Sequence, residues 1–293
     1  MRVDIDRIVG KHKKEAYRNS EWIASALSHI NEGLEGLEQE YVNQVQAEPE
    51  WPIVLISFLP RSGSTLLYQL LAKTGNFNYI SNFQSRFWRS PCVGRLIENS
   101  ISPRLYSEIQ LSSDFGNTKG FSSPHEFNYF WEEHLGIDGN NNSEIKTAEF
   151  TKKKQEEFRK EIIGLLSQEA KPLLFKREYL ILNLSILKNV FPNVRIINLE
   201  RNFDDIISSQ MKAIEKVHAN NYEGFFGTAL ESFVYDENIT LESNVRRQTK
   251  QLKERLDHEI EESGFPAITV EYEKLCQDAE SEMSKIKNWI SAT

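Results

Sequence analysis

The sequence predicts an α/β fold in which a central parallel sheet is flanked by helices in three layers. Short, continuous apolar runs alternate along the chain with segments whose apolar residues recur every three or four positions. This alternation is typical of buried strands separated by amphipathic helices. A glycine-containing loop also joins the first apolar run to a helix. Because ligands of parallel sheets bind at the carboxyl ends of the strands, we expect the site among residues that directly follow strands.

A helix-favouring segment, residues 11–46, comes first. Its apolar residues recur at three and four positions and form one stripe: Ile23, Leu27, Ile30, Leu34, Leu37 and Tyr41. We expect this stripe to lie on the main domain, and the alternative is a homo-oligomer through a coiled coil of the same helix. The predicted organisation is an N-terminal helical extension, residues 1–50, followed by one domain, residues 51–293.

The first predicted strand, residues 53–56, leads into the loop PRSGST, residues 60–65, and then into a helix. The free N–H groups of a first helical turn and the helix dipole favour an anion at this point. Arg61 adds a full positive charge, and Gly63 lets the backbone approach a phosphate-sized group. Hydroxyl donors come from Ser62, Ser64 and Thr65. The loop is therefore a predicted anion site.

The general nucleotide-triphosphate loop, GxxxxGK[ST], fits this segment poorly. If Gly63 takes the second glycine position, Phe58 stands at the first glycine and Ser64 at the lysine. An ordinary ATPase or kinase is therefore disfavoured. The remaining alternative is a loop whose glycine and hydroxyls only cap the helix.

Three further strands are predicted to end in polar residues. The run at 171–176 closes with Lys176, the run at 194–199 precedes Arg201, and the run that starts at 267 leads to Tyr272. Parallel strands end at the same edge of a sheet. We therefore expect these three side chains to converge with the loop, although they are far apart in sequence.

Composition excludes several classes of protein. The 293 residues carry a formal net charge of −8, so binding of nucleic acid through a general basic surface is not expected. The sequence shows no apolar run of membrane-spanning length and no secretory signal, and neither is expected. Cys92 and Cys276 form neither a disulfide framework nor a metal pattern. A reducing compartment, hence the cytoplasm, is expected.

Two segments carry a resemblance to a known family. The loop at 60–65 resembles the 5′-phosphosulfate loop, P-[RK]-S-G-[TS]-T, of sulfotransferases that use 3′-phosphoadenosine 5′-phosphosulfate (PAPS), in a bacterial-type branch. Residues 201–209 resemble the 3′-phosphate motif of the same family, R-[ND]-P-x-D-x-x-x-S, with Phe203 in place of the proline. The resemblance extends from residue 52 to residue 289. The domain at 51–293 is thus predicted to be a sulfotransferase domain.

The resemblance implies a three-layer fold similar to that of P-loop NTPases, and transfer of a sulfuryl group from PAPS to an acceptor hydroxyl or amine, with PAP as product. Residues 61–65 would hold the 5′-phosphosulfate, and Arg201 with Ser209 would hold the 3′-phosphate. Lys176 would stabilise the transferring oxygens, and Tyr272 would lie near the adenine. No metal is expected, because lysine, arginine and the helix dipole supply the positive charge that magnesium supplies in kinases.

The catalytic base has three candidates. His125 and Glu126 open a predicted helix beside aromatic residues, and Glu178 stands where the small-molecule branch of the family has a histidine. His125 is favoured because its ordinary pKa lies near neutral pH. Glu126 is the second candidate, or would orient His125, and Glu178 is the main competitor.

The acceptor stays open among small molecules, lipids, glycans and natural products. Its pocket is expected in the variable stretches 74–150 and 215–245, which show little regular pattern. Two alternatives to a sulfotransferase remain. One is a nucleotide kinase or NTPase of the same fold, and the other is a non-catalytic nucleotide-binding protein.

Overall fold

The computed structural model describes residues 2–9, 19–45, 49–101, 103–114, 117–137, 143–191, 193–217, 227–228 and 230–291. The helices are α1 (Ile5–Val9), α2 (Glu21–Gln44), α3 (Ser64–Lys73), α4 (Pro91–Ile101), α5 (Asn128–Leu135), α6 (Lys152–Leu166), α7 (Glu178–Leu182), α8 (Leu184–Leu187), α9 (Phe203–Val217), α10 (Leu241–Ser263), α11 (Tyr272–Gln277) and α12 (Ala279–Ser291), with short 3-10 turns η2 (Gln84–Arg86) and η3 (Tyr106–Glu108). The strands are β1 (Ile53–Ser57), β2 (Asn78–Tyr79), β3 (Ser113–Asp114), β4 (Asn117–Thr118), β5 (Leu173–Lys176), β6 (Val194–Glu200) and β7 (Ala267–Glu271). In the described part of the chain, no helix is long and apolar enough to cross a membrane.

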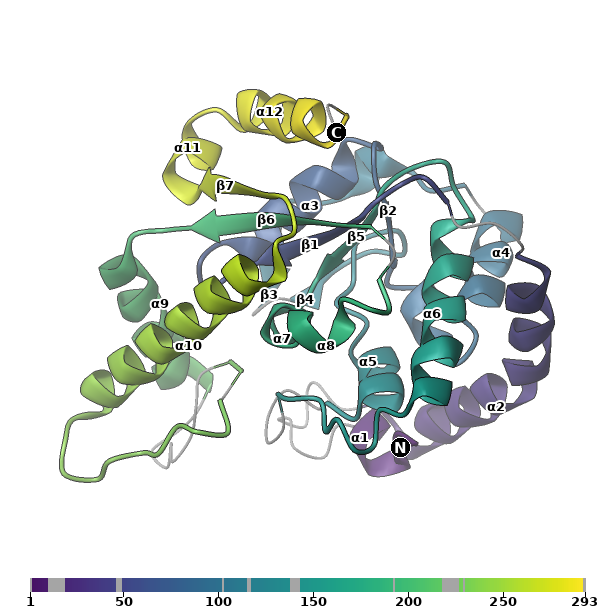
Figure 1. The fold of residues 1–293 in the computed structure, drawn as a ribbon, viewed down its shortest axis with the longest axis horizontal. Helices are drawn as coiled ribbons and strands as arrows, with labels where there is room; N and C mark the ends of the chain where they lie inside the picture. Colours follow the sequence, from purple (N-terminus) through teal and green to yellow (C-terminus); the bar gives the residue numbers. More distant parts are fainter. Residues whose placement is uncertain are drawn as a thin grey trace.

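The central sheet has the strand order β2-β5-β1-β6-β7, and every pairing in it is parallel (Figure 1). The predicted α/β fold with a central parallel sheet is therefore confirmed. Strand β1 lies between β5 and β6: after β1 the chain forms β2 and β5 on one side of it and then β6 and β7 on the other, so β1 lies at the point where the strand order reverses. This is the position at which open parallel sheets bind ligands.

Alternation along β1 produces the three layers. Val54 and Ile56 belong to a buried cluster with residues of α3 and α12, whereas Ile53 and Leu55 belong to a second cluster with residues of α6, α7 and α10. Successive strand residues point to opposite faces of a sheet, so an apolar run on β1 serves both clusters. Figure 1 shows α3 and α12 on one side of the sheet and α7, α8 and α10 on the other.

The N-terminal helix packs differently from the prediction. Helix α2 lies against α4 and α6, as expected for docking on the main domain. Three residues of the predicted stripe, however, are exposed to 44–53%: Ile23, Ile30 and Leu37. The expected contact face is therefore wrong, although Leu27 and Tyr41 of the same stripe do pack against the core. Residues 11–18 and 46 of the predicted helix lie outside the described residues.

Polar contacts explain why α2 docks through a face other than the predicted apolar stripe. Asn31 and Glu38 are fully buried. The Glu38 carboxylate accepts the backbone N–H groups of Cys92 and Val93, both at 2.9 Å, and so caps the first turn of α4. Asn31 donates to the carbonyl of Arg86 at 2.8 Å. A carboxylate at a helix N-terminus satisfies otherwise unpaired N–H groups, which makes this polar face the one that docks.

Candidate active site

The loop between β1 and α3 has an unusual backbone. Arg61 and Gly63 both have positive φ, 70° and 94°. Gly63 forms the N-cap of α3 without a side-chain cap, and the first bond within the helix runs from the N–H of Leu67 to the Gly63 carbonyl, at 3.2 Å. The N–H groups of the first turn therefore point toward the loop, where they can bind an anion. A Cβ at Gly63 would lie 2.2 Å from Cε2 of Tyr272, so glycine alone fits beneath that ring.

The segment after β6 is bonded directly to this loop. Arg201 Nη1 donates to the carbonyl of Arg61 at 2.9 Å, and Arg61 Nε donates to Ser209 Oγ at 3.3 Å. From the next residue of α9, Gln210 Nε2 donates to the carbonyl of Pro60 at 3.0 Å. The Arg201 guanidinium also lies 4.4 Å from the centre of the Tyr272 ring. The two segments that resemble donor-binding motifs thus form one bonded unit.

Lys176 ends β5, in register with Ile56 of the neighbouring β1. Its side chain is buried, its ammonium pairs with Glu126 Oε1, and it lies 4.8 Å from the centre of the Phe58 ring. The second oxygen of Glu126 accepts Arg177 Nη1 at 2.8 Å. Burial alone would raise the pKa of Glu126, but Lys176 and Arg177 outweigh it and lower this pKa to about 2. Glu126 therefore pairs with two cations, Lys176 and Arg177.

Glu178 opens α7, two residues beyond Lys176, and is buried. Its Oε1 accepts the hydroxyl of Thr228. Its Oε2 makes no hydrogen bond to a described residue, and it lies 3.8 Å from Arg177 Nη1. One carboxylate oxygen is thus fixed while the other keeps its acceptor capacity.

A cavity of about 470 Å³ brings these groups together. All the predicted site residues line it except Ser62 and His125; the predicted members of the lining are Arg61, Gly63, Ser64, Thr65, Glu126, Lys176, Glu178, Arg201, Ser209 and Tyr272. The predicted convergence at the carboxyl edge of the sheet is therefore observed. In this cavity, hydroxyls, helix N–H groups and four cationic side chains, those of Arg61, Lys176, Arg177 and Arg201, line the same space.

His125 and Ser62 lie beside the cavity rather than in its lining. His125 Nδ1 accepts the backbone N–H of Phe127 at 2.9 Å, just ahead of α5. That ring nitrogen is engaged within its own turn, which changes the order of preference among the three candidate bases. Ser62 is buried, and its backbone N–H donates to the carbonyl of Leu59 at 3.0 Å.

Two buried polar atoms at the site indicate that a phosphorylated ligand fits there. Ser62 Oγ and Arg201 Nε are both buried and have no hydrogen-bond partner among the described residues. Buried donors of this kind are normally satisfied. One belongs to the expected 5′-phosphosulfate loop and the other to the expected 3′-phosphate motif. The site therefore offers unused donors at both places where the resemblance puts an anionic group of the donor.

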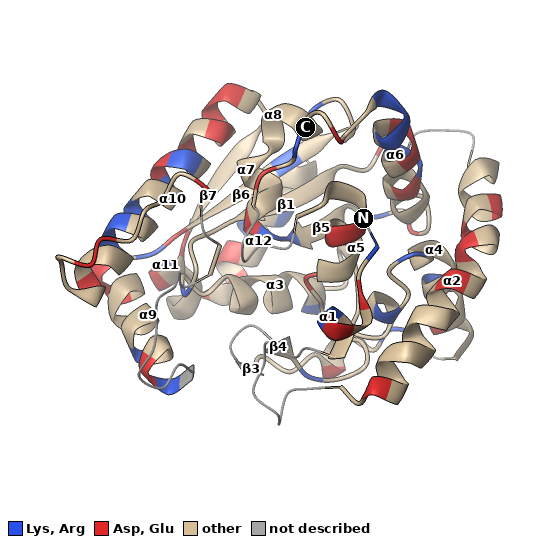
Figure 2. Cartoon of the chain, turned by 90° about the horizontal axis from the view of Figure 1, so that it is seen from below, with Lys and Arg blue, Asp and Glu red and all other residues tan. Residues whose placement is uncertain are grey.

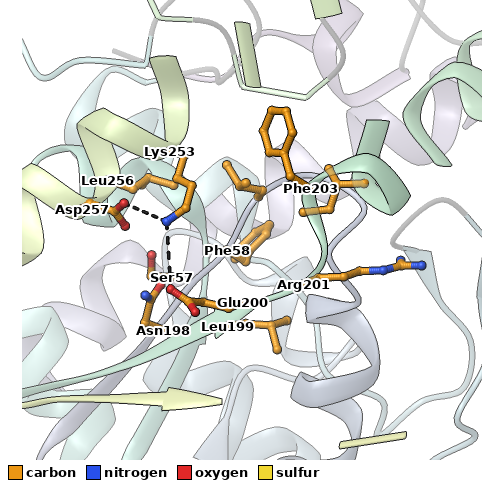
Figure 3. Close-up of a pocket in the computed structure, with 12 residues that line it drawn as sticks. Ser57, Phe58, Asn198, Leu199, Glu200, Arg201, Phe203, Lys253, Leu256 and Asp257 are labelled. Carbon is orange, nitrogen blue, oxygen red and sulfur yellow. Dashed lines mark hydrogen bonds and ion pairs between the residues drawn. The ribbon is translucent and has the colours of Figure 1, made fainter. Parts of the chain in front are cut away.

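A second, smaller cavity of about 120 Å³ lies behind Phe58 and Arg201 (Figure 3). Lys253 and Arg201 both line it, but Lys253 is already paired with Asp257 at 2.8 Å and lies 4.0 Å from Glu200. In Figure 3 the Arg201 side chain points away from these three residues. An anion therefore finds its positive partners in the larger cavity.

Positive charge at the larger cavity is local. Figure 2 shows acidic and basic residues interspersed along α6 and α10 and acidic residues on α2, in keeping with the net charge of −8. Against this background, Arg61, Lys176 and Arg201 line one cavity together. Such a local cluster selects a compact anion and not a long polyanion.

Sequence reasoning missed several residues of the lining. Phe58, Ser113 and Gly227 face the cavity without having been predicted as site residues. Ser113 and Gly227 do fall in the stretches 74–150 and 215–245, which were expected to form the acceptor pocket. No motif marks them, so only the spatial convergence identifies them. Residues 138–142 and 218–226 of those stretches lie outside the described residues.

Fold and site together define a class: an α/β protein in which a strand–loop–helix and a later arginine–serine segment are hydrogen-bonded to each other and line one cavity with donors for an anion. A sequence model described as "Sulfotransferase family" matches residues 52–292. The chain belongs to the sulfotransferase family, and the predicted activity, a sulfotransferase, is confirmed at that level. The family implies PAPS as the donor of the sulfuryl group.

Solved structures with the same fold are sulfotransferases from mycobacteria. Sulfotransferase STF9 from Mycobacterium avium is 13% identical, with a TM-score of 0.51, and the match covers 93% of this chain and 73% of that one. Sulfotransferase STF1 from Mycobacterium tuberculosis H37Rv is 12% identical, with a TM-score of 0.51, and the match covers 89% of this chain and 72% of that one. These likenesses support the fold. No curated protein sequence matches the chain.

Proposed function

We propose that the protein transfers a sulfuryl group from PAPS to a hydroxyl of a small-molecule, lipid, glycan or natural-product acceptor, without a metal. One observation carries the proposal: the loop at 60–65 and the segment at 201–209 are hydrogen-bonded to each other and share a cavity with Lys176. An NTPase or kinase would need a lysine in this loop, where Ser64 stands. The two thiols, Cys92 and Cys276, are free and accord with a cytoplasmic enzyme.

The donor is held at two ends. The first-turn N–H groups of α3, Arg61 and the hydroxyls of the loop bind the 5′-phosphosulfate. Arg201 and Ser209 bind the 3′-phosphate, which distinguishes PAPS from ATP. Tyr272, stacked on Arg201 and on Gly63, forms the wall beside the adenine. These roles need no divalent cation, because the charge of the donor meets arginine, lysine and helix N–H groups.

Lys176 stabilises the transferring and departing oxygens. Its ammonium is paired with Glu126, and an incoming phosphosulfate competes for it. Placed N–H and ammonium donors aimed at developing negative charge are usually a large part of catalysis. Glu126 therefore holds Lys176 until the donor binds. When Lys176 turns to the donor, Glu126 keeps its second partner, Arg177.

Glu178 is the base of this proposal. Its Oε2 accepts the proton of the acceptor hydroxyl while the hydroxyl oxygen forms a bond to sulfur. The bond from sulfur to the phosphate oxygen breaks, its electron pair stays on that oxygen, and PAP leaves with the new charge facing Lys176. General-base assistance of this kind contributes roughly 10²–10⁴ in rate. Support comes from the burial of Glu178 in the lining and from its uncommitted oxygen, whereas His125 lies outside the lining.

The donor assignment is tested by ligand binding. PAP should bind and stabilise the protein, by about 2.7 kcal/mol at a hundredfold excess over Kd, and ATP should do so far less. Arg201→Ala should weaken PAP by about one to two decades, the value of a charged hydrogen-bond partner. Adenosine 5′-phosphosulfate, which lacks the 3′-phosphate, should bind the wild type and Arg201→Ala alike. Arg246→Ala, on the exposed surface of α10, is the matched control and should leave both ligands unchanged.

Two results would contradict the proposal. Equal stabilisation by ATP and PAP would remove the donor assignment and favour the kinase or NTPase alternative. Tight PAP binding without any conversion of PAPS, with the acceptor classes named above, would favour the non-catalytic alternative.

For the base, Glu178→Gln should lower turnover by at least two decades on the scale given above, and His125→Ala by less. The opposite ranking, with PAP affinity intact in both variants, would return the role to His125.

A further inference from the structure

A two-residue segment outside the recognised motifs touches both the donor loop and the proposed base. Gly227 has φ of 83°, and a Cβ there would lie 2.4 Å from Cγ of Pro60. The chain can approach Pro60 this closely only with glycine, because both the space and the backbone conformation exclude a side chain. Gly227 therefore packs directly on the first residue of the loop that begins the anion site.

The next residue reaches the base. Thr228 is buried, and its hydroxyl donates to Oε1 of Glu178. A carboxylate with neither oxygen fixed can rotate about its last bond. With Oε1 held by Thr228, Oε2 is left as a buried oxygen that makes no hydrogen bond to a described residue. The hydroxyl thus decides which carboxylate oxygen keeps its acceptor capacity.

The segment is anchored on its C-terminal side. Leu230 and Phe233 are buried in the same cluster as Ile53 and Leu55 of β1. The loop side is anchored too, since the Pro60 carbonyl accepts Gln210 and Gln210 in turn accepts the hydroxyl of Thr249, both at 3.0 Å. Gly227 and Thr228 lie between two fixed structures, so a shift of either residue would move the loop and the carboxylate relative to each other.

We propose that Gly227 and Thr228 form a positioning strap, in which Gly227 sets its distance from the donor loop and Thr228 aims Glu178 at the acceptor. This inference rests on the proposed function, because it takes Glu178 as the base. Neither strap residue touches the reacting atoms. Thr228 acts through Glu178, and Gly227 acts through Pro60.

The test compares Thr228→Val, which keeps the shape of the side chain and removes the hydroxyl, with Thr228→Ser, which keeps the hydroxyl. Thr228→Val is also combined with Glu178→Gln in a double-variant cycle. Conversion of PAPS to PAP is followed by chromatography against pH, with a phenol, a primary alcohol or water alone as acceptor. Thr228→Val should lower kcat about tenfold, the scale of one hydrogen bond. Its acid limb should move to higher pH, because loss of a donor favours the protonated carboxyl. Thr228→Ser should restore both, and PAP affinity should stay unchanged.

In a Glu178→Gln background, Thr228→Val should have no further effect on kcat, because both changes remove the same function. Additive losses, or a Thr228→Val enzyme with an unchanged pH profile, would overturn the inference. If Thr228→Val does not fold, Thr228→Ala takes its place in the same cycle and must meet the same criteria. A wild type that binds PAP but converts no PAPS would instead refute the proposed function.

Gly227→Ala should weaken PAP binding at least tenfold through Pro60, and unchanged affinity would remove Gly227 from the strap.

Discussion

The pairing of Glu126 with Lys176 predicts that one substitution will destabilise the ligand-free enzyme and tighten donor binding. Glu126→Gln leaves the buried ammonium of Lys176 without a carboxylate and leaves Arg177 only Glu178, at 3.8 Å. The pKa of Glu126 falls from 4.5 to about 2 in the folded protein, which corresponds to about 3 kcal/mol. Removing one member of a buried pair costs about the same. A loss of this size lowers Tm by roughly 5–10 °C in a protein of this length.

PAP should recover about half of this loss. In the wild type, a phosphate that binds Lys176 must first displace Glu126, whereas in Glu126→Gln the ammonium is already open to it. We therefore expect PAP to bind Glu126→Gln at least about tenfold more tightly, equivalent to 1.4 kcal/mol. Denaturant unfolding with and without PAP, together with calorimetric titration, measures both effects.

Glu132→Gln is the matched control. Glu132 is another buried carboxylate, paired with Arg7 at 2.6 Å and absent from the cavity lining. Its loss should lower stability as well, but the increment that PAP adds should equal the wild-type increment. The reasoning would be refuted if Glu126→Gln and Glu132→Gln responded alike to PAP, or if Glu126→Gln left the stability of the ligand-free protein unchanged.

Two buried titrating groups predict opposite slopes of stability against pH. Burial lowers the pKa of His134 from 6.5 to about 4. The unfolded chain therefore binds more protons between these pH values, and stability falls as pH drops through this window. His134→Phe, beside Phe130 and Phe158, should flatten this slope in a series of urea unfolding curves, and an unchanged slope would contradict the prediction. Burial, with Glu38 adding to it, raises the pKa of Glu161 from 4.5 to about 9, so the folded state binds more protons and stability falls as pH rises from 4.5 toward 9. Glu161→Gln should therefore stabilise the protein at pH 8 and change little at pH 4, and a loss of stability at pH 8 would contradict this account.

The fold and most of the cavity could be predicted because both follow from local patterns. Continuous apolar runs predicted β1, β5 and β6, and a shorter β-rich stretch predicted β7. The rule that parallel strands end at one edge brought Arg61, Lys176 and Arg201 together in advance. Each of these residues directly follows or ends an apolar run, so its place needs no long-range information. Strand β2 has only two residues, Asn78 and Tyr79, and a run of that length gives no periodic signal.

Other features depend on contacts that no local pattern encodes. The docking face of α2 was mispredicted because the apolar stripe is visible in sequence, whereas the need of α4 for a capping carboxylate is not. Glu38 satisfies that need from another helix. His125 was favoured for its ordinary pKa and its place at a predicted helix start beside aromatic residues, and its hydrogen bond to the backbone of Phe127 appears only in three dimensions. Thr228 lies in a stretch without regular pattern, and its partner is 50 residues away.

The bond between Arg201 and the Arg61 carbonyl spans 140 residues, and the bond between Gln210 and Pro60 spans 150. Closing loops of this length costs conformational entropy before any contact compensates for it, and topologies rich in such contacts fold slowly. No short contiguous fragment contains both halves of the proposed donor site, so we expect a nascent chain that has not yet paired β6 with β1 to bind the nucleotide poorly. We therefore expect donor affinity to appear at a late stage of folding, and PAP in refolding buffer to stabilise only molecules that have already formed the site.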